Sequence, residues 1–243
     1  MKNKKPYLSI IIPVFNEERR LKNIKLVGKY LKAQKFTSEL VVVNDGSTDK
    51  TEELLKKYVK EFPLRIISYK PNQGKGYAIK TGMLKAYGKY HLFTDIDLST
   101  PIETVNIFMK QVSKYPVIIG TRKHSKSKVI IHQPKWREFM GKVYTYLSNL
   151  ILGVNVTDLT CGFKCFSDNA SKKIFSKITT NKWGFDAEAI ALTRKLKFKL
   201  LEIPVQWSNE RDSRVKLPQD AISSFTELIK IRFKITTNRY KIK

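Results

Sequence analysis

Cysteine is scarce in this chain. Of 243 residues only two are cysteines, Cys161 and Cys165, and no distant cysteine pair exists to form a disulfide framework. No histidine lies beside them, and two thiols alone are too few for a structural zinc site. We therefore expect two reduced thiols in a cytoplasmic protein.

Long apolar runs are also missing. No stretch reaches the roughly 18 consecutive apolar residues of a membrane-spanning helix. The apolar segment at residues 7–14 is too short, and too soon followed by charged residues, to be a signal peptide. Internal repeats and low-complexity segments are absent. With 42% apolar residues, the length fits one α/β domain with a core.

Acidic residues are outnumbered by basic ones. Lysine and arginine number 47 against 21 aspartates and glutamates, which gives a formal net charge of +26. Such a charge attracts nucleic acid, an anionic membrane surface or a phosphorylated substrate. A solvated lysine-rich surface without a specific partner is the alternative. No nucleic-acid-binding module is recognisable, so we expect no nucleic-acid partner.

Strand-like and helix-like segments alternate along the first half with short connections. The predicted strands are residues 8–14, 40–43, 64–69, 91–94 and 117–120, and the predicted helices are residues 17–31, 51–61, 74–87 and 103–114. This alternation favours an α/β fold with a Rossmann-like, mostly parallel sheet and helices on both faces.

The second half has a different pattern. Residues 123–135 are basic and lack periodicity, which predicts a mobile loop, and residues 200–207 form a strand-like run. Residues 136–152 and 220–233 predict two amphipathic helices.

Polar clusters follow the predicted strands of the first half. In chain order they are Asn16-Glu17, Asp45-Gly46-Ser47, residues 72–76, residues 95–97 and Thr121-Arg122. The carboxyl ends of parallel strands meet at one edge of a sheet, and ligands bind at that edge. We therefore expect these clusters to form one site.

Asp95 and Asp97 are the candidate metal ligands. Two carboxylates one residue apart at a strand end normally point the same way, so both can reach one cation, or one can reach the cation and the other a sugar hydroxyl. A divalent cation, Mn²⁺ or Mg²⁺, suits the diphosphate of a nucleotide sugar and neutralises the charge that builds on it. An Asp-x-Asp triplet also occurs in many surface turns, so its place after an apolar strand carries the interpretation.

The other strand ends have two interpretations each. Asp45 can accept a hydrogen bond from a nucleotide base or close an Asx-turn. Asn16 and Glu17 can line a ligand or begin a helix. Lys75 stands between two glycines before a helix, an arrangement that suits an anion. Neither a P-loop nor a Gly-x-Gly-x-x-Gly after the first strand is present, which argues against a dinucleotide-binding dehydrogenase.

Basic residues in and after the last cluster are candidates for binding phosphate, because a guanidinium group can bind it through two hydrogen bonds. The set comprises Arg122, Arg137, Arg211, Arg214 and Lys216. Exposed basic residues without a specific role are the alternative.

Taken together, the clusters resemble glycosyltransferase family 2, which has the GT-A fold. The matching segments are residues 9–17, 43–49, 72–76 and 95–98. In the second half, residues 158–166, 183–188, 202–207 and 213–216 resemble the polyprenyl-phosphate glycosyltransferases. Within that group the chain looks most like the dolichyl-phosphate β-glucosyltransferases, and the resemblance covers about residues 7–235.

The resemblance implies an inverting transfer of a hexose from a nucleotide sugar to a polyprenyl or dolichyl phosphate. UDP-glucose is the favoured donor and GDP-mannose the next. A single domain would span residues 1–235, with a nucleotide-sugar-binding half at 7–122, an acceptor-side half at 123–235 and a basic tail at 236–243.

The resemblance also implies roles for individual residues. The donor would contact Pro13, Phe15, Asn16, Glu17, Asp45, Lys75 and Asp95. Asp95 and Asp97 would hold the metal and, with Arg122, form the catalytic set. The acceptor phosphate would be bound by Arg122, Arg137, Arg214 and Lys216.

Three features depart from the family. Asn44 stands where the family usually has an aspartate, and Ser99 stands where mannosyltransferase relatives often place a glutamine ligand. Many relatives carry transmembrane helices, and this chain has no such run. We expect peripheral attachment to an anionic membrane on its cytosolic face, through residues 136–152, residues 220–233 and the basic excess, or through a separate membrane protein. Core packing is the alternative for both helices, and a soluble or polysaccharide acceptor is the alternative for the reaction.

Overall fold

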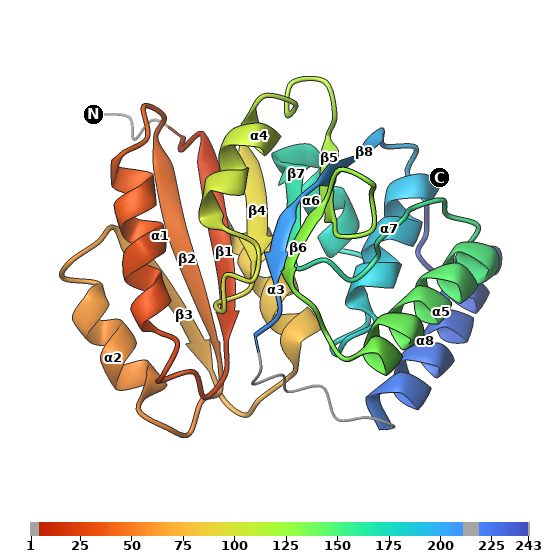
Figure 1. Cartoon of the computed structure of the whole chain (residues 1–243), viewed down its shortest axis with the longest axis horizontal. Coiled ribbons are helices and arrows are strands. Elements are labelled where there is room, and N and C mark those ends of the chain that lie inside the picture. The colour runs from red at the N-terminus through yellow and green to blue at the C-terminus, as the bar shows by residue number, and fades with distance from the viewer. Residues whose placement is uncertain (1–4, 211–218, 243) are drawn as a thin grey trace.

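Within residues 5–210 and 219–242, which the computed structural model describes, the chain forms a seven-stranded sheet (Figure 1). The strand order is β3-β2-β1-β4-β7-β5-β8. The strands are β1 (Leu8–Val14), β2 (Ser38–Asp45), β3 (Leu64–Tyr69), β4 (Tyr90–Thr94), β5 (Val117–Thr121), β7 (Phe163–Ser167) and β8 (Leu200–Pro204). Each strand predicted in the first half is present, and the α/β fold with a mostly parallel sheet is confirmed.

β7 is the exception to the parallel arrangement. It runs antiparallel to both of its neighbours, β4 and β5, whereas the other pairs in the sheet are parallel. Its register places Lys164 opposite Phe93 and Phe163 opposite Thr94. A segment from the second half of the chain therefore lies directly beside the strand that leads to Asp95.

Helices cover both faces of the sheet. On one face lie α1 (Lys22–Lys32), α2 (Thr51–Tyr58), the short 3₁₀ helix η1 (Ile102–Thr104) and α4 (Val105–Met109). On the other face lie α3 (Lys75–Lys85), α6 (Asp168–Phe175) and α7 (Phe185–Lys195). Side chains alternate along β1, so Ile10 and Ile12 pack into the first layer and Ile11 into the second.

The predicted loop at residues 123–135 is wrong in part. Residues Lys128–Ile131 form β6, which pairs in parallel with β9 (Gln206–Ser208) in a small second sheet. Val129 packs beside the core, and the Lys128 amide donates to the carbonyl of Val205. The excess of lysine hid a short β-branched run whose partner strand is distant in the chain.

Two long helices lie side by side at one end of the molecule (Figure 1). They are α5 (Lys135–Leu152) and α8 (Gln219–Thr236), and both were predicted from their apolar spacing. α5 ends at Gly153, whose φ of 63° is the left-handed conformation typical of a helix terminus. Among the described helices, none is both long enough and apolar enough to cross a bilayer.

Candidate active site

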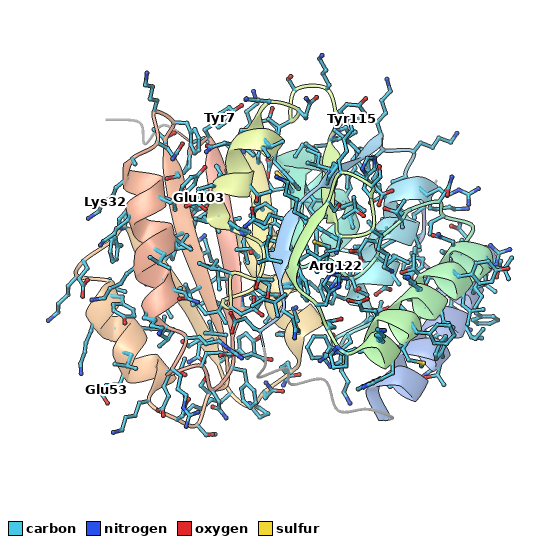
Figure 2. The ribbon with its side chains drawn as sticks, in the orientation of Figure 1. Tyr7, Lys32, Glu53, Glu103, Tyr115 and Arg122 are labelled. Carbon is cyan, nitrogen blue, oxygen red and sulfur yellow. The ribbon has the colours of Figure 1, made fainter. Side chains whose placement is uncertain are left out.

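The predicted clusters lie at the carboxyl-terminal edge of the parallel strands. Figure 2 shows Tyr7 and Tyr115, which precede β1 and β5, at one edge, and Arg122, which follows β5, toward the other. Hydrogen bonds and an ion pair connect the clusters that follow β1, β2, β3 and β4 along this edge.

Lys75 and Asp95 form an ion pair at the centre of this edge. The ammonium Nζ lies 2.6 Å from Asp95 Oδ1 and 5.2 Å from the centre of the Trp183 ring. Burial lowers the pKa of Lys75, but the charges of Asp95, Asp186 and Asp97 outweigh it, and the net pKa is raised. Lys75 is therefore a fixed positive charge beside the candidate metal ligands.

Asp97 faces a small cavity of about 20 Å³ that Asp95, Ser99, Gly162 and Trp207 also line. That volume holds about one water-sized group. Burial and the charge of Asp95 raise the pKa of Asp97, although the Ser99 amide donates a hydrogen bond to Asp97 Oδ1 at 2.9 Å. A cation between the two carboxylates would relieve this repulsion.

The donor set fits a divalent cation that also binds substrate. The described residues hold no cluster of three or more acidic, histidine or cysteine ligands. Mg²⁺ and Mn²⁺ sites in phosphate-handling enzymes use one or two carboxylates, and phosphate oxygens of the substrate complete them. Asp95 and Asp97 match that pattern, and Ser99, whose amide donates to Asp97 Oδ1, lines the same cavity.

Asp45 lies at the end of β2 with its carboxylate turned to the loop before α3. Oδ1 accepts from the Gln73 amide at 2.8 Å, and Oδ2 accepts from the Gly74 amide at 2.9 Å and from Asn72 Nδ2 at 2.8 Å. The carboxylate thus clamps the loop that leads to Lys75. The predicted base contact stays a prediction, and any such contact shares the carboxylate with this loop.

Asn16 and Glu17 fasten the end of β1 to the end of β2. Asn16 Oδ1 accepts from the Thr48 amide at 2.7 Å, and the Glu17 amide donates to Thr51 Oγ1 at 2.8 Å. The predicted helix at 17–31 starts at Lys22 in the structure, because residues 17–21 form a turn. Pro13 and Phe15 lie beside this turn and are half-buried.

The glycines around Lys75 serve backbone packing. A side chain at Gly76 would collide with the carbonyl oxygens of Thr180 and Lys182. The Tyr77 amide donates to Asn181 O at 3.1 Å, so this amide is not available to an anion. Lys75 itself, rather than the amides of the turn, remains the candidate for binding phosphate.

Arg122 is held rigidly at the end of β5. Its Nε and Nη2 donate to the two carboxylate oxygens of Asp158 at 2.6 and 2.8 Å, and Nη2 also donates to Thr160 Oγ1 at 2.7 Å. The guanidinium carbon lies 5.2 Å from the centre of the Trp207 ring. Within the described part of the chain Nη1 makes no hydrogen bond, so the guanidinium keeps a donor for an anion.

Charge and burial act oppositely on this pair. Burial would raise the pKa of Asp158, but Arg122 lowers it well below the usual range. Burial would lower the pKa of Arg122, and Asp158 raises it above its usual value. Asp158 was not predicted as a functional residue, although it begins the segment 158–166 that resembles the family pattern.

Arg137 lies near Arg122 on the first turn of α5. Burial and the charge of Arg122 lower the pKa of Arg137, as expected for two neighbouring cations. Lys123 contacts the middle of the same helix, donating to Gly141 O at 3.0 Å and to Thr145 Oγ1 at 2.8 Å. The candidates Arg211, Arg214 and Lys216 lie outside the described residues.

A buried ion pair lies beneath the site. Lys164, with no exposed surface, donates to Asp186 Oδ1 at 2.5 Å and to Cys161 O at 2.6 Å. Burial raises the pKa of Asp186, and the positive charge of Lys164 opposes this effect without cancelling it. A lysine within an apolar strand was the signal available in the sequence, because buried lysines need a partner.

Comparison with known proteins agrees with this geometry. Residues 9–175 match the model of glycosyl transferase family 2. The chain belongs to this family. It is a family 2 glycosyltransferase with the GT-A-like fold, and the predicted family is confirmed.

Two relatives match nearly the whole chain, and a solved structure of low sequence identity shares its fold. It is 30% identical to the dolichyl-phosphate β-glucosyltransferase of Dictyostelium discoideum, over 100% of this chain and 80% of the relative. It is 33% identical to the dolichyl-phosphate β-glucosyltransferase of Saccharomyces cerevisiae, over 97% of this chain and 77% of the relative. Glucosyl-3-phosphoglycerate synthase of Mycobacterium tuberculosis, solved with Mn²⁺ and UDP, shares the fold with a TM-score of 0.64 at 16% identity, over 98% of this chain and 81% of that one.

Proposed function

We propose that this enzyme transfers glucose from UDP-glucose to a dolichyl or polyprenyl phosphate, with inversion at the anomeric carbon. GDP-mannose is the second candidate donor. Relatives that span nearly the whole chain carry the name of that activity. The acceptor would be an anion, which agrees with two neighbouring arginines beside the carboxylate pair.

One observation carries the proposal: Trp207 lies between the two halves of the site. Trp207 is one of the residues that line the cavity of Asp95 and Asp97, and the guanidinium carbon of Arg122 lies 5.2 Å from the centre of its ring. A diphosphate held at the carboxylates and a phosphate held at Arg122 would therefore be neighbours. Such proximity is what a transfer between two phosphate-bearing substrates needs.

The residues of the site have separable tasks in this proposal. Lys75 neutralises the diphosphate of the donor, and the turn formed by Asn16, Glu17 and their partners borders the nucleotide. Arg122, oriented by Asp158, and Arg137 bind the acceptor phosphate. A phosphate oxygen is already anionic, so its attack on the anomeric carbon needs no strong general base, and positioning with charge neutralisation supplies most of the rate.

Asp95 and Asp97 would hold a divalent cation, Mn²⁺ or Mg²⁺. When bound, the ion stabilises the negative charge on the departing nucleoside diphosphate. Lys75 already pairs with Asp95 at 2.6 Å, so the lysine and the ion would share this carboxylate and act on the same diphosphate.

The exposed face of α5 and α8 supports attachment to an anionic membrane. Large apolar side chains on this face are more than half exposed or nearly so: Trp136, Phe139, Tyr146 and Leu150 on α5, and Ile229 and Phe233 on α8. Basic side chains such as Lys142, Lys230 and Arg232 are exposed among them. Aromatic and basic residues on adjacent helices are typical of interfacial helices.

The deciding experiment is a transfer assay. The protein is incubated with polyprenyl phosphate, Mn²⁺ or Mg²⁺, and radiolabelled UDP-glucose or GDP-mannose in turn. We expect labelled lipid from UDP-glucose, and no labelled lipid from either donor would refute the proposal. Transfer to a soluble glycan but not to the lipid would favour the alternative acceptor.

A matched variant tests the carboxylate assignment. Asp97→Ala should lose transfer by roughly 100-fold or more while its melting temperature stays within a few degrees. Full activity in this variant would show that Asp97 does not hold the metal or the diphosphate.

A further inference from the structure

The loop between α6 and α7, residues 176–184, contacts α3 on one side and α8 on the other. On the α3 side, Lys80 Nζ donates to Ile178 O at 2.6 Å and the Tyr77 amide donates to Asn181 O at 3.1 Å. Gly74 and Gly76 lack the side chains that would collide with this loop. The loop therefore packs directly against the turn that carries Lys75.

On the α8 side, the loop is held by a carboxylate. Glu227 Oε2 accepts a hydrogen bond from the Gly184 amide at 2.9 Å, and a side chain at Gly184 would collide with that oxygen. Among the described residues, the Glu227 carboxylate makes no second hydrogen bond and no ion pair. Burial raises the pKa of Glu227.

The hydrogen-bonded amide belongs to the residue after Trp183. The Trp183 ring lies 5.2 Å from Lys75 Nζ, and Asp95 Oδ1 lies 2.6 Å from the same nitrogen. The ammonium group thus has an aromatic face on one side and a carboxylate on the other. Fixing the 183–184 turn fixes the aromatic face, and with it the direction from which an anion can reach Lys75.

We propose that Glu227 is a positioning residue for the donor site: it holds the Trp183–Gly184 turn so that Trp183 orients Lys75 toward the donor diphosphate. This inference rests on the proposed donor role of Lys75. Trp183 and Glu227 thus join Gly162 and Trp207, which line the cavity of Asp95 and Asp97, as contributions of the second half of the chain to this site. α8 therefore stabilises the donor site from its inner face while its outer face carries Ile229 and Phe233.

The test measures donor binding without the lipid acceptor. UDP-glucose and GDP-mannose are titrated calorimetrically into the unmodified protein and into Glu227→Ala, Glu227→Gln and Trp183→Leu. Thr226→Ala, an exposed neighbour on α8, is the matched control. Melting temperatures are recorded for every variant, and steady-state transfer separates the donor KM from the acceptor KM.

We expect Glu227→Ala and Trp183→Leu to weaken donor binding roughly fivefold to tenfold, the range of one cation–π contact, with the acceptor KM unchanged. Glu227→Gln keeps an acceptor oxygen and should bind the donor within about twofold of the unmodified protein. Thr226→Ala should have no effect.

Other outcomes overturn the inference. Unchanged donor affinity in folded Glu227→Ala and Trp183→Leu would show that the loop does not orient Lys75. Equal losses for donor and acceptor that follow the melting temperature would show a purely structural role. If the unmodified protein bound neither nucleotide sugar, both the donor role of Lys75 and the positioning role of Glu227 would be wrong. If it bound one nucleotide sugar but did not transfer the sugar to lipid, only the proposed acceptor would be wrong.

Discussion

At the scale of single residues, Gly162 shows how closely the carboxylate pair is surrounded. A Cβ atom built on Gly162 would fall on the carboxylate of Asp95. The residue follows Cys161, which is fully buried and packs near β5, so the backbone has little freedom to retreat. The lack of a side chain at Gly162, rather than the flexibility of its backbone, therefore allows Asp95 to occupy its position.

Gly162→Ala should displace Asp95 and lower transfer by roughly 100-fold, the cost typical of an error of about 1 Å in a reacting geometry. Gly141→Ala on α5 is the matched control, because a Cβ there meets nothing within 4 Å. The control should keep full activity and gain up to about 1 kcal/mol of stability from the helix interior. Normal kcat/KM in Gly162→Ala would contradict the steric argument.

Asp158 makes a second prediction, which concerns pH. Its pKa is lowered in the folded protein, so its ionised form stabilises the fold above the unfolded-state pKa near 3.9, and this contribution is lost as the pH falls below it. Asp158→Asn should cost about 3 kcal/mol at pH 7, because Arg122 loses its buried partner.

The measurement is the free energy of unfolding of both proteins by denaturant at pH 7, 5 and 3. The difference between them should be equal at pH 7 and 5 and smaller at pH 3. A difference that grows on acidification would mean that the Asp158 carboxylate is not stabilised by Arg122. The variant should also raise the acceptor KM, because Arg122 is no longer oriented.

Single residues also show where sequence reasoning reached its limit. Asp95, Lys75 and Arg122 were identified because each follows a strand in a recognisable cluster. Asp158 and Glu227 were not, because a carboxylate in a loop or on a helix gives no local sign of the distant N–H group that it accepts from. Such partners lie 36 and 43 residues away and are determined by the fold alone.

At the scale of elements, the first half of the chain was predictable and the second was less so. Local apolar periodicity determines strands such as β1 and helices such as α3. β6 and β9 are short, at four and three residues, so they carry too few positions for an alternating pattern. β7 is as long as β4, but the charged Lys164 interrupts its apolar run. α6 and α7 went unassigned although Ser167 caps α6 by accepting from the Ala170 amide.

The exposed face of α5 gives the third prediction. Phe139→Glu should reduce co-sedimentation with vesicles of anionic lipid roughly tenfold or more. The substitution removes an exposed aromatic side chain that would enter the lipid surface, and it adds a negative charge that the anionic lipid repels. Leu26→Glu on α1 changes another apolar residue that is more than half exposed, away from α5 and α8, and should bind as the unmodified protein does. Equal losses in both variants would indicate general aggregation or nonspecific charge, and no binding by the unmodified protein would refute membrane attachment.

At the scale of the whole molecule, the net charge of +26 predicts a strong dependence on salt. Attraction between exposed lysines and anionic lipid is screened within about 8 Å at physiological ionic strength and about 3 Å at 1 M. Vesicle binding should therefore fall severalfold or more between 0.1 and 1 M NaCl, as measured by co-sedimentation. Binding to zwitterionic vesicles should be weaker and nearly independent of salt. Salt-independent binding to anionic vesicles would show that the charge plays no part.

The antiparallel strand β7 has a consequence for how the protein is made. β4 ends at residue 94 and pairs with β1 on one side, but its other side gains a partner only when residues 163–167 are available. β5 ends at residue 121, and both of its partners, β7 and β8, follow it in the chain. A nascent chain that has emerged only to residue 122 would leave the β7-facing backbone N–H and C=O groups of β4 unpaired, and such an open edge is a template for association with other chains. The donor half is therefore complete late in translation. Expressing the two halves as separate fragments would leave the strands that normally flank β7 without partners. Each fragment alone should therefore aggregate, whereas the two fragments expressed together should assemble into a soluble complex.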